Sequence, residues 1–503
     1  MGPHSLDATR VIITMRIHLL DRGAILDTSV VRCPTARPSP LRRLFCPVLA
    51  AVLCLGVGAL SAAEPNAEAE GLKTETVSLG ASERRAGEGN APQRVEQFKD
   101  YGLGMFIHWS VDCPFGSVIS HHLVGSEKAY QDRFFTQAPG FFDPQEFNPK
   151  AWAKLAKLAG MKYVVFTTKH HAGFCMWDTA TTDFKVTNTP YQKDITRLLF
   201  DAFRAEGLRI GVYFSPDDFW MLHRQGHPIT RNRPEADPRN NPELMRHNLA
   251  QLKELLTNYG AIDMVFFDGE PDQLKQLAWK MDPRILVTRG EMKTPEQHLP
   301  ATRLVEPWEA NFTMGTEWPF KPTNETYKSG TELIKVLVEV RAKGGNLLLN
   351  IGPEPDGVIP FEQTRRLREL ALWMLIKEEA IYEVRPWVIT NDGSLWFTHS
   401  KKEDTLYVVE TAVPWGWGTW REFVIHSAKA TAKTEVEVVG QTGESRCWST
   451  EPCHATWKQV ADGLHVKAMF AQRLYTDCKW PNPIVIRLRH VQAVRPAKTG
   501  DKK

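Results

Sequence analysis

The fold is decided by the stretch MKYVVFTTKHHAGF (161–174) and by the segments that follow it. Its run of β-branched and aromatic residues predicts a buried strand. The amphipathic segment DITRLLFDAFRAEG (194–207) then predicts a helix, and RIGVYFS (209–215) predicts the next strand. A strand, a helix and a second strand in this order indicate two parallel strands joined by a covering helix.

The same alternation recurs along the chain from about residue 94 to residue 383. About 290 residues of such units fit a TIM-like (β/α) barrel better than an open doubly wound sheet. Neither GxGxxG after the first strand nor a P-loop is present. Gly160, Gly207 and Gly260 follow helical segments and are suited to the left-handed residue after a last turn. We therefore expect a catalytic (β/α) barrel over residues 94–383.

After Val384 the pattern changes to short alternating segments separated by turns, such as TLYVVE (405–410) and PIVIRLRH (483–490). This pattern predicts an antiparallel β-sandwich domain over residues 384–503. Within it, Cys447 and Cys453 are the natural candidates for a disulfide.

The N-terminal region predicts export of the protein. Arg42 and Arg43 precede the uncharged run LFCPVLAAVLCLGVGAL (44–60), which is typical of a signal peptide cleaved near Ala63. We expect residues 1–63 to be a leader with this signal peptide, residues 64–93 to be a polar linker, and the mature protein to be periplasmic or extracellular. A membrane anchor is the alternative, but a run of 17 residues is short for a span.

The charge gives no support for binding to nucleic acid. The whole chain carries +3, but seven Arg and three Asp lie in residues 1–63, so the remainder carries −1. Binding through phosphate neutralisation needs a basic surplus, which this remainder lacks. We also expect no membrane attachment after leader removal, and the sequence leaves a homo-oligomer open.

The apolar runs of the expected barrel end in polar or aromatic side chains. These are His108 and Trp109, His170 and His171, Tyr213 and Ser215, Asp268, Arg289, Trp308 and Glu309, and Asn350. Barrel enzymes build their sites at the carboxyl ends of the strands, so seven runs of this kind predict one active-site rim.

Asp268 ends the buried run DMVFFDG (263–269) and is a candidate nucleophile. An ionised aspartate can attack an anomeric carbon while a second carboxylic acid protonates the leaving oxygen. Metal ligation is the rival use of the rim. Because adjacent residues such as His170 and His171 project in opposite directions on an extended chain, and neither HxH nor HExxH occurs, we expect no metal.

The aromatic residues of the rim suit a sugar. Indole faces such as those of Trp109 and Trp308 pack against the C–H faces of a pyranose, while His, Tyr, Asn and Arg side chains hydrogen-bond its hydroxyls. We therefore expect a barrel hydrolase that acts on a neutral sugar, with a barrel that only binds sugar as the alternative.

Six segments of the chain resemble the α-L-fucosidases of glycoside hydrolase family 29. They are GMFIHWS (104–110), MKYVVFTTKHHAGF (161–174), DMVFFDGE (263–270), MKTPEQ (292–297), WEANFTMGTEW (308–318) and KGGNLLLNIGPEPDG (343–357). The resemblance implies a retaining exo-hydrolase that releases terminal α-L-fucose from an oligosaccharide or glycoconjugate through a covalent fucosyl-enzyme intermediate, with no metal or organic cofactor. The alternatives are a non-catalytic fucose-binding barrel and a barrel hydrolase of another neutral sugar.

The resemblance also implies roles for single residues. Asp268 matches the nucleophile of the family, and Glu296 matches a glutamate that is the acid/base in related enzymes, with Glu309 as a rival for the acid. The implied substrate-binding residues are His108, His170, His171, Tyr213 and Arg289, and the indole faces of Trp109 and Trp308 complete the substrate-binding residues that we expect.

Two features depart from the family pattern. The usual aspartate after the two histidines is Ala172, and a glutamate–tryptophan pair expected after the first strand is replaced by ISHHLVGSEKAY (119–130). His121, His122 and Glu127 are the candidates to substitute for that pair, so the outer wall of the substrate pocket differs from the family pattern.

Overall fold

The structure is a computed structural model and describes residues 88–495. The predicted leader, its cleavage point near Ala63 and most of the predicted linker lie outside the described residues. Among residues 88–495, no helix is both long enough and apolar enough to cross a membrane.

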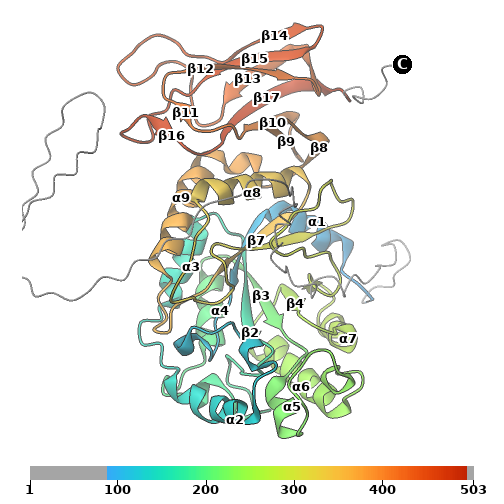
Figure 1. The fold of residues 1–503 in the computed structure, drawn as a ribbon. Coiled ribbons are helices and arrows are strands. Elements are labelled where there is room, and N and C mark those ends of the chain that lie inside the picture. The colour runs from blue at the N-terminus through green and yellow to red at the C-terminus, as the bar shows by residue number, and fades with distance from the viewer. Residues whose placement is uncertain (1–87, 496–503) are drawn as a thin grey trace, which may run out of the picture. The chain divides into compact units, whose positions relative to one another are not determined.

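A seven-stranded parallel sheet forms the first part of the fold (Figure 1). Its strands are β1 (Leu103–Ile107), β2 (Tyr163–Lys169), β3 (Arg209–Phe214), β4 (Met264–Phe267), β5 (Leu286–Val287), β6 (Glu309–Thr313) and β7 (Asn346–Ile351). They pair in the order β5-β4-β3-β2-β1-β7-β6, and every pairing is parallel. The expected β/α alternation is confirmed, with β5 and β6 as the edges of the sheet.

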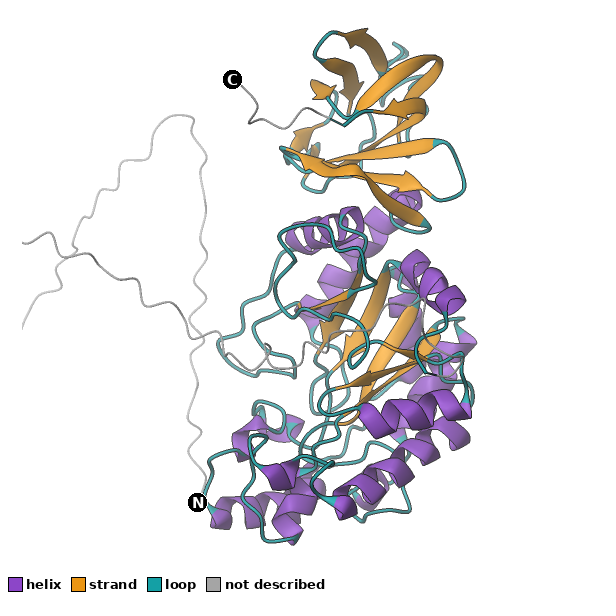
Figure 2. Ribbon diagram, turned by 90° about the vertical axis from the view of Figure 1, so that its right-hand side faces the viewer, coloured by secondary structure: helices purple, strands orange, loops and turns teal. Residues whose placement is uncertain are grey.

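Helices join and cover these strands, as Figure 2 shows. They are α1 (Pro92–Tyr101), α2 (Lys128–Gln137), α3 (Pro149–Leu158), α4 (Ile195–Ala205), α5 (Phe219–Arg224), α6 (Pro242–Asn258), α7 (Asp272–Met281), α8 (Gly330–Ala342) and α9 (Phe361–Lys377). Side-chain caps start several of them; Ser329 and Glu332, for example, form a reciprocal capping box at α8. Gly160 has a positive φ of 83° after α3, and a Cβ there would lie 2.5 Å from the Tyr382 hydroxyl. A side chain at this position would therefore be strained and would clash.

Alternate residues of the strands face opposite sides of the sheet. Phe106, Val165, Tyr213, Phe266 and Leu348 belong to one buried cluster, which fills the concave face of the sheet. Their immediate neighbours along the strands belong to the larger cluster that the helices cover. Both faces are buried, which explains why the strands read as continuous apolar runs in the sequence.

The end of β2 is irregular. Thr167 pairs with Tyr213 and Lys169 pairs with Phe214, so Thr168 is an extra residue in the register. Lys169 is fully buried, and its side chain points from the sheet towards the helices. Its Nζ donates a hydrogen bond to Asn248 Oδ1 of α6 at 2.7 Å. A bulge of this kind redirects the side chains that follow it.

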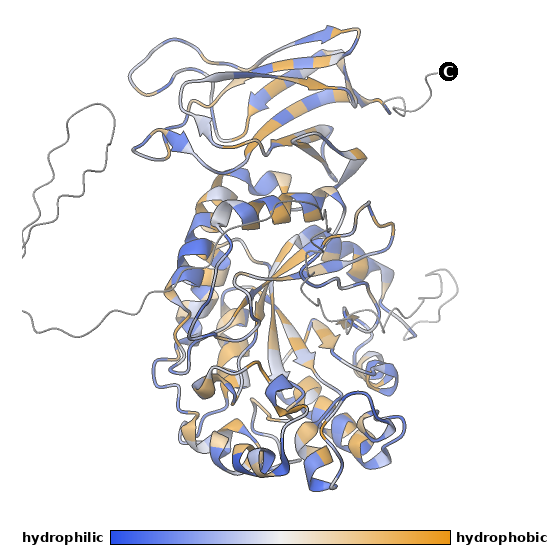
Figure 3. Ribbon diagram, viewed as in Figure 1, coloured by the Kyte–Doolittle hydropathy of each residue, from blue (hydrophilic) through white to orange (hydrophobic). Residues whose placement is uncertain are grey.

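Antiparallel sheets follow the last helices. One has five strands, β8 (Val384–Asp392), β9 (Leu395–Ser400), β10 (Thr405–Glu410), β13 (Ala428–Val438) and β17 (Ile484–Ala493); another has β12 (Trp420–Ile425), β14 (Thr456–Val460) and β15 (Gly463–Met469). A short third pair joins β11 (Trp415–Gly416) and β16 (Lys479–Trp480). Figure 3 shows hydrophobic and hydrophilic residues alternating along β13 and β17, as in strands with one buried face. The expected pairing of Cys447 with Cys453 is wrong, since both thiols are free.

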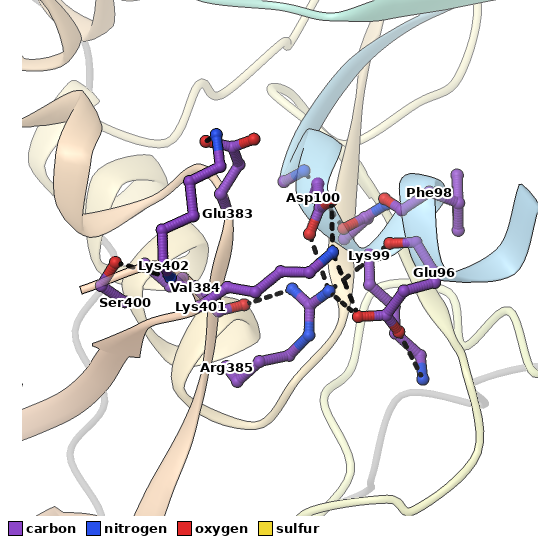
Figure 4. Close-up of polar contacts among 12 residues, drawn as sticks. Glu96, Phe98, Lys99, Asp100, Glu383, Val384, Arg385, Ser400, Lys401 and Lys402 are labelled. Carbon is purple, nitrogen blue, oxygen red and sulfur yellow. Dashed lines mark hydrogen bonds and ion pairs between the residues drawn. The ribbon is translucent and has the colours of Figure 1, made fainter. Parts of the chain in front are cut away.

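The sheets are tied to the helices by specific contacts. Trp373 of α9 donates its Nε1–H to the Pro483 carbonyl at 2.8 Å. Arg385 and Lys401, from β8 and the turn after β9, both reach Asp100 of α1, at 2.7 and 2.9 Å (Figure 4). Glu96 joins the same ionic cluster.

Candidate active site

The carboxyl ends of the strands bring most of the predicted rim residues together. His108 follows β1, His170 and His171 follow β2, and Tyr213 lies in β3. The His108 ring is 6.0 Å from the His170 ring and 5.7 Å from the Tyr213 ring, and the His170 and Tyr213 rings are stacked at 5.4 Å. Asp268 follows β4 and Arg289 follows β5 on the same side. The structure thus gathers residues of five strands into one polar site.

Asp268 is the most heavily contacted carboxylate of this site. Its Oδ2 accepts a hydrogen bond from the Tyr213 hydroxyl at 2.7 Å, and its Oδ1 lies 3.4 Å from Arg289 Nη1 and 3.5 Å from Arg231 Nη2. Burial alone would raise the pKa of Asp268, but the positive charges of Arg231 and Arg289 outweigh burial and hold the pKa well below its ordinary value. Asp268 is therefore ionised at neutral pH, with a side chain that is 20 % exposed.

The histidines of the site are neutral. Burial lowers the pKa of His108 to about 4 and lowers the pKa values of His170 and His171 well below the ordinary value. His108 Nδ1 lies 2.6 Å from the Asn350 Oδ1 acceptor, so its Nδ1 carries the proton. Its Nε2 is therefore a lone-pair acceptor.

His171 has the same tautomer. The Ser215 hydroxyl donates its hydrogen to the Asp217 carbonyl. Ser215 Oγ must therefore be the acceptor of the hydrogen bond with His171 Nδ1 at 2.6 Å, so Nδ1 carries the proton. The His171 Nε2 lone pair then faces Asp268 Oδ2 at 3.5 Å. This Nε2 is buried and has no hydrogen-bond partner within residues 88–495. Two acceptors that face each other at this distance provide a place for a hydroxyl donor or a cation.

Glu296 lies on the loop after β5 and is ion-paired with Arg289. Since Arg289 also contacts Asp268, one guanidinium joins the two carboxylates that the sequence analysis singled out. Gln297, the next residue, lines a hollow of about 470 Å³ together with Thr313, Lys328 and Glu332. This hollow adjoins Glu296 and not the histidines.

Glu309 is not placed as the sequence suggested. The run ending at Glu309 was expected to be a strand, but Glu309 is the first residue of β6 and pairs with Asn346, the first residue of β7. Glu309 is fully buried and accepts a hydrogen bond at 2.5 Å from the hydroxyl of Tyr163, which is the first residue of β2. Glu309 therefore lies at the amino-terminal end of the strands, opposite the end that carries Asp268.

Two of the expected tryptophans are packed in the core. Trp109 is fully buried, with its ring 5.3 Å from that of Trp152 on α3. Trp308 is 1 % exposed and packs on Gly345, where an added Cβ would lie 2.4 Å from the indole. A tryptophan that does reach the site is Trp318, whose ring is 4.9 Å from that of His108.

Several residues of the site were missed by the analysis of the sequence. Arg231 comes from the segment between α5 and α6 and donates through Nε to Asp217 Oδ2 at 2.5 Å. Burial raises the pKa of Asp217 to about 6, against the opposing effect of Arg231. The signal for Asp217 was its position three residues after the end of β3; no periodicity marks Arg231.

The loop that departs from the family pattern also contributes to the site. The Ser120 hydroxyl accepts from the Ala172 amide and contacts His170 Nδ1, both at 2.8 Å. Asp112 holds this loop through the Ser120 amide at 3.1 Å and through His122 Nε2 at 2.5 Å. His121 points to the histidines after β2, whereas Glu127 is exposed at the start of α2.

A parallel β/α sheet with an ionised aspartate, a nearby glutamate and buried neutral histidines at the carboxyl ends of its strands fits a glycoside hydrolase of the barrel type. The model of the family described as Alpha-L-fucosidase matches residues 81–379. The chain therefore belongs to the alpha-L-fucosidase family, as the resemblance implied.

Relatives and solved structures agree with this membership. The plasma alpha-L-fucosidases of Rattus norvegicus and Homo sapiens are both 28 % identical, over 404 and 413 residues, which is 70 % and 71 % of this chain and 84 % of each relative. Alpha-L-fucosidase isoenzyme 1 from Paenibacillus thiaminolyticus superposes with a TM-score of 0.63 at 28 % identity, over 80 % of this chain and 99 % of that one. The Thermotoga maritima alpha-fucosidase gives 0.61 at 26 %, over 78 % and 96 %. These matches confirm the predicted barrel followed by a β-sandwich.

Proposed function

We propose that Asp268 is the nucleophile and Glu296 the acid/base of a retaining exo-α-L-fucosidase that acts on fucosylated oligosaccharides or glycoconjugates. The observation that carries this proposal is the state of Asp268, which is kept ionised by Arg231 and Arg289 and positioned by the Tyr213 hydroxyl. An ionised, positioned carboxylate at the mouth of the barrel is what attack on an anomeric carbon requires.

The reaction has two steps. An Asp268 oxygen attacks the anomeric carbon, the bond from that carbon to the glycosidic oxygen breaks, and Glu296 gives its proton to the leaving oxygen. Water then attacks the same carbon, gives a proton to Glu296 and releases Asp268. Glu296 is paired with Arg289 in the structure, so the acid role requires Glu296 to leave this contact and turn to the glycosidic oxygen.

The neutral histidines suit the fucose hydroxyls. A hydroxyl can donate to a lone pair such as that of His171 Nε2, which is buried and unpaired among the described residues. His108, His170, His121 and Tyr213 surround the same space and supply further contacts. Trp318 offers an apolar face beside His108 for the C–H groups of the sugar. The hollow next to Glu296 gives room for the glycan beyond the scissile bond.

Paired variants test this assignment. Asp268→Ala should abolish turnover of every fucoside, since the covalent intermediate cannot form. Glu296→Ala should lose about 10²–10⁴-fold on natural glycans but little on aryl fucosides with good leaving groups. Added azide should then attack the β-linked intermediate from the opposite face and give α-L-fucosyl azide, with retention of configuration.

Two outcomes would contradict the proposed function, and each points to a different alternative. A protein that binds fucose but shows no Asp268-dependent turnover on aryl or natural fucosides would be a non-catalytic binding protein. An aryl glycoside panel with another sugar preferred would instead support a hydrolase of that sugar.

We also propose that residues 1–63 direct export and are removed, leaving a barrel over 94–383 and a β-sandwich over 384–503 as separate domains. The uncharged run after Arg42 and Arg43 supports this. Amino-terminal sequencing of the protein recovered from the periplasm or medium should begin close to residue 64, and an intact leader on exported protein would contradict it.

A further inference from the structure

A third histidine completes a cluster with the two after β2. His121 lies in a 3-10 turn (His121–Leu123), and its ring is 5.9 Å from the His170 ring and 5.3 Å from the His171 ring. One ring nitrogen from each of the three lies within 4.8 Å of the others. On a regular extended chain His170 and His171 would project in opposite directions, but their rings are 4.2 Å apart.

Two of the three histidines have one ring nitrogen held in a hydrogen bond, as metal-binding histidines do. Metal-ligating imidazoles usually hold one ring nitrogen in a hydrogen bond, which orients the ring and leaves the other nitrogen for the ion. Here Nδ1 of His170 and Nδ1 of His171 are held by the Ser120 and Ser215 hydroxyls. His171 Nε2 is a buried lone pair without a hydrogen-bond partner within residues 88–495. This orphaned acceptor is an independent indication of a ligand.

The spacing around His171 also fits an ion. Two ligands of a tetrahedral zinc ion at 2.0–2.1 Å are about 3.3 Å apart. His171 Nε2 and Asp268 Oδ2 are 3.5 Å apart, so both can bind one ion with little movement. The His121 ring makes no hydrogen bond among the described residues and is only partly buried, so it is free to move closer to the other two.

The surrounding charge accepts a cation. Asp217, Asp268 and Glu296 contribute three carboxylates, against the two guanidinium groups of Arg231 and Arg289. Imidazole nitrogens together with a carboxylate are ligands that Zn²⁺ and Cu²⁺ bind well.

We propose that His121, His170 and His171, with Asp268, bind a divalent transition metal such as Zn²⁺ reversibly, and that the ion inhibits the enzyme by occupying the place of the sugar. The site is an inhibitory one and not a cofactor site, because the ion engages the nucleophile itself. The proposal goes beyond the hydrolytic function, and metal binding is measurable without turnover.

Calorimetric titration of the purified full-length protein with Zn²⁺ tests binding directly. Binding of one ion per chain at this site should be displaced by saturating free fucose. His121→Ala should weaken the binding of Zn²⁺ at least about 100-fold. Loss of a hydrogen-bond partner of a metal ligand already weakens metal binding by up to about 100-fold, and loss of a ligand should cost at least as much. His465→Ala is the matched control, since His465 lies on β15 with Asp462 as its partner, and it should leave this binding unchanged.

Kinetics give the second readout. Zn²⁺ should raise the KM for an aryl α-L-fucoside without changing kcat, and a chelator should restore full activity. Zinc binding that fucose does not displace overturns the proposal, whether or not the His121 variant folds. Inhibition that lowers kcat alone, or that is as strong in His121→Ala as in the wild type, overturns it as well.

Discussion

Replacing Glu309 by glutamine separates a buried structural carboxyl from a catalytic one. Burial raises the pKa of Glu309 from its ordinary value of 4.5 to about 7, against the weaker effects of the Tyr163 hydrogen bond and of Arg289. A folded-state pKa above the unfolded value means that the protonated carboxyl stabilises the fold, and that this contribution is lost as the pH rises through 7. At 1.36 kcal/mol per pKa unit, the wild type should lose about 2.5 kcal/mol from this group between pH 5 and pH 8.

Glu309→Gln keeps an acceptor for the Tyr163 hydroxyl and carries no charge. The variant should therefore be more stable than the wild type at pH 8, by up to about 2.5 kcal/mol more than at pH 5. Urea unfolding of both proteins at the two pH values measures this difference. Glu306→Gln is the matched control, because Glu306 is exposed three residues earlier, and it should show no such pH-dependent gain.

The same variant decides between the two candidate acids. Glu309→Gln should keep its turnover on natural glycans, since Glu309 lies at the end of the strands opposite Asp268. A loss on natural glycans that is absent on activated aryl fucosides, with rescue by azide, would refute this reasoning and make Glu309 the acid.

Two further changes follow from buried polar contacts. Burial lowers the pKa of Lys377 from 10.5 to about 7, so the free energy of unfolding of the wild type should rise by about 1.4 kcal/mol per pH unit above pH 7. Chemical denaturation should therefore show that Lys377→Met is more stable than the wild type at pH 7 and that this gain shrinks by pH 9. An equal gain at both pH values would contradict this prediction. Ser120→Ala removes the contact to His170 Nδ1, which is worth about 1 kcal/mol. Steady-state kinetics should show a KM for an aryl fucoside that is about fivefold to tenfold higher, with a smaller change in kcat. An unchanged KM would show that Ser120 does not position His170.

The sequence predicted those parts of the site that depend on strand ends. Asp268 and His108 follow apolar runs directly, and parallel strands bring their carboxyl ends together, so periodicity alone located them. The assignment failed for Glu309 because β6 is preceded by a weak apolar run, RLVEPWE, which the structure leaves outside the sheet up to Glu309 itself. The sequence carries no strand register, so it does not distinguish the start of β6 from the end of a strand.

The remaining differences depend on contacts that periodicity does not encode. His170 and His171 follow the last residue of β2, and their rings lie 4.2 Å apart, whereas adjacent residues within a regular strand would point to opposite faces. Arg231 reaches Asp268 from a segment without regular structure, and its role depends on tertiary contacts alone. Trp109 carried an aromatic signal, but only the packing of α3 shows that its ring faces the helices.

The central claim is that the Asp268 carboxylate forms the covalent intermediate. An activated 2-deoxy-2-fluoro-fucoside should form this intermediate quickly and hydrolyse it slowly, so it should inactivate the enzyme with one label per chain. Proteolysis and mass spectrometry should then find the added 2-fluoro-fucosyl mass on Asp268. A label on Glu296, on Asp217 or on any other side chain, or steady turnover of this substrate with no labelled chain, would contradict the account.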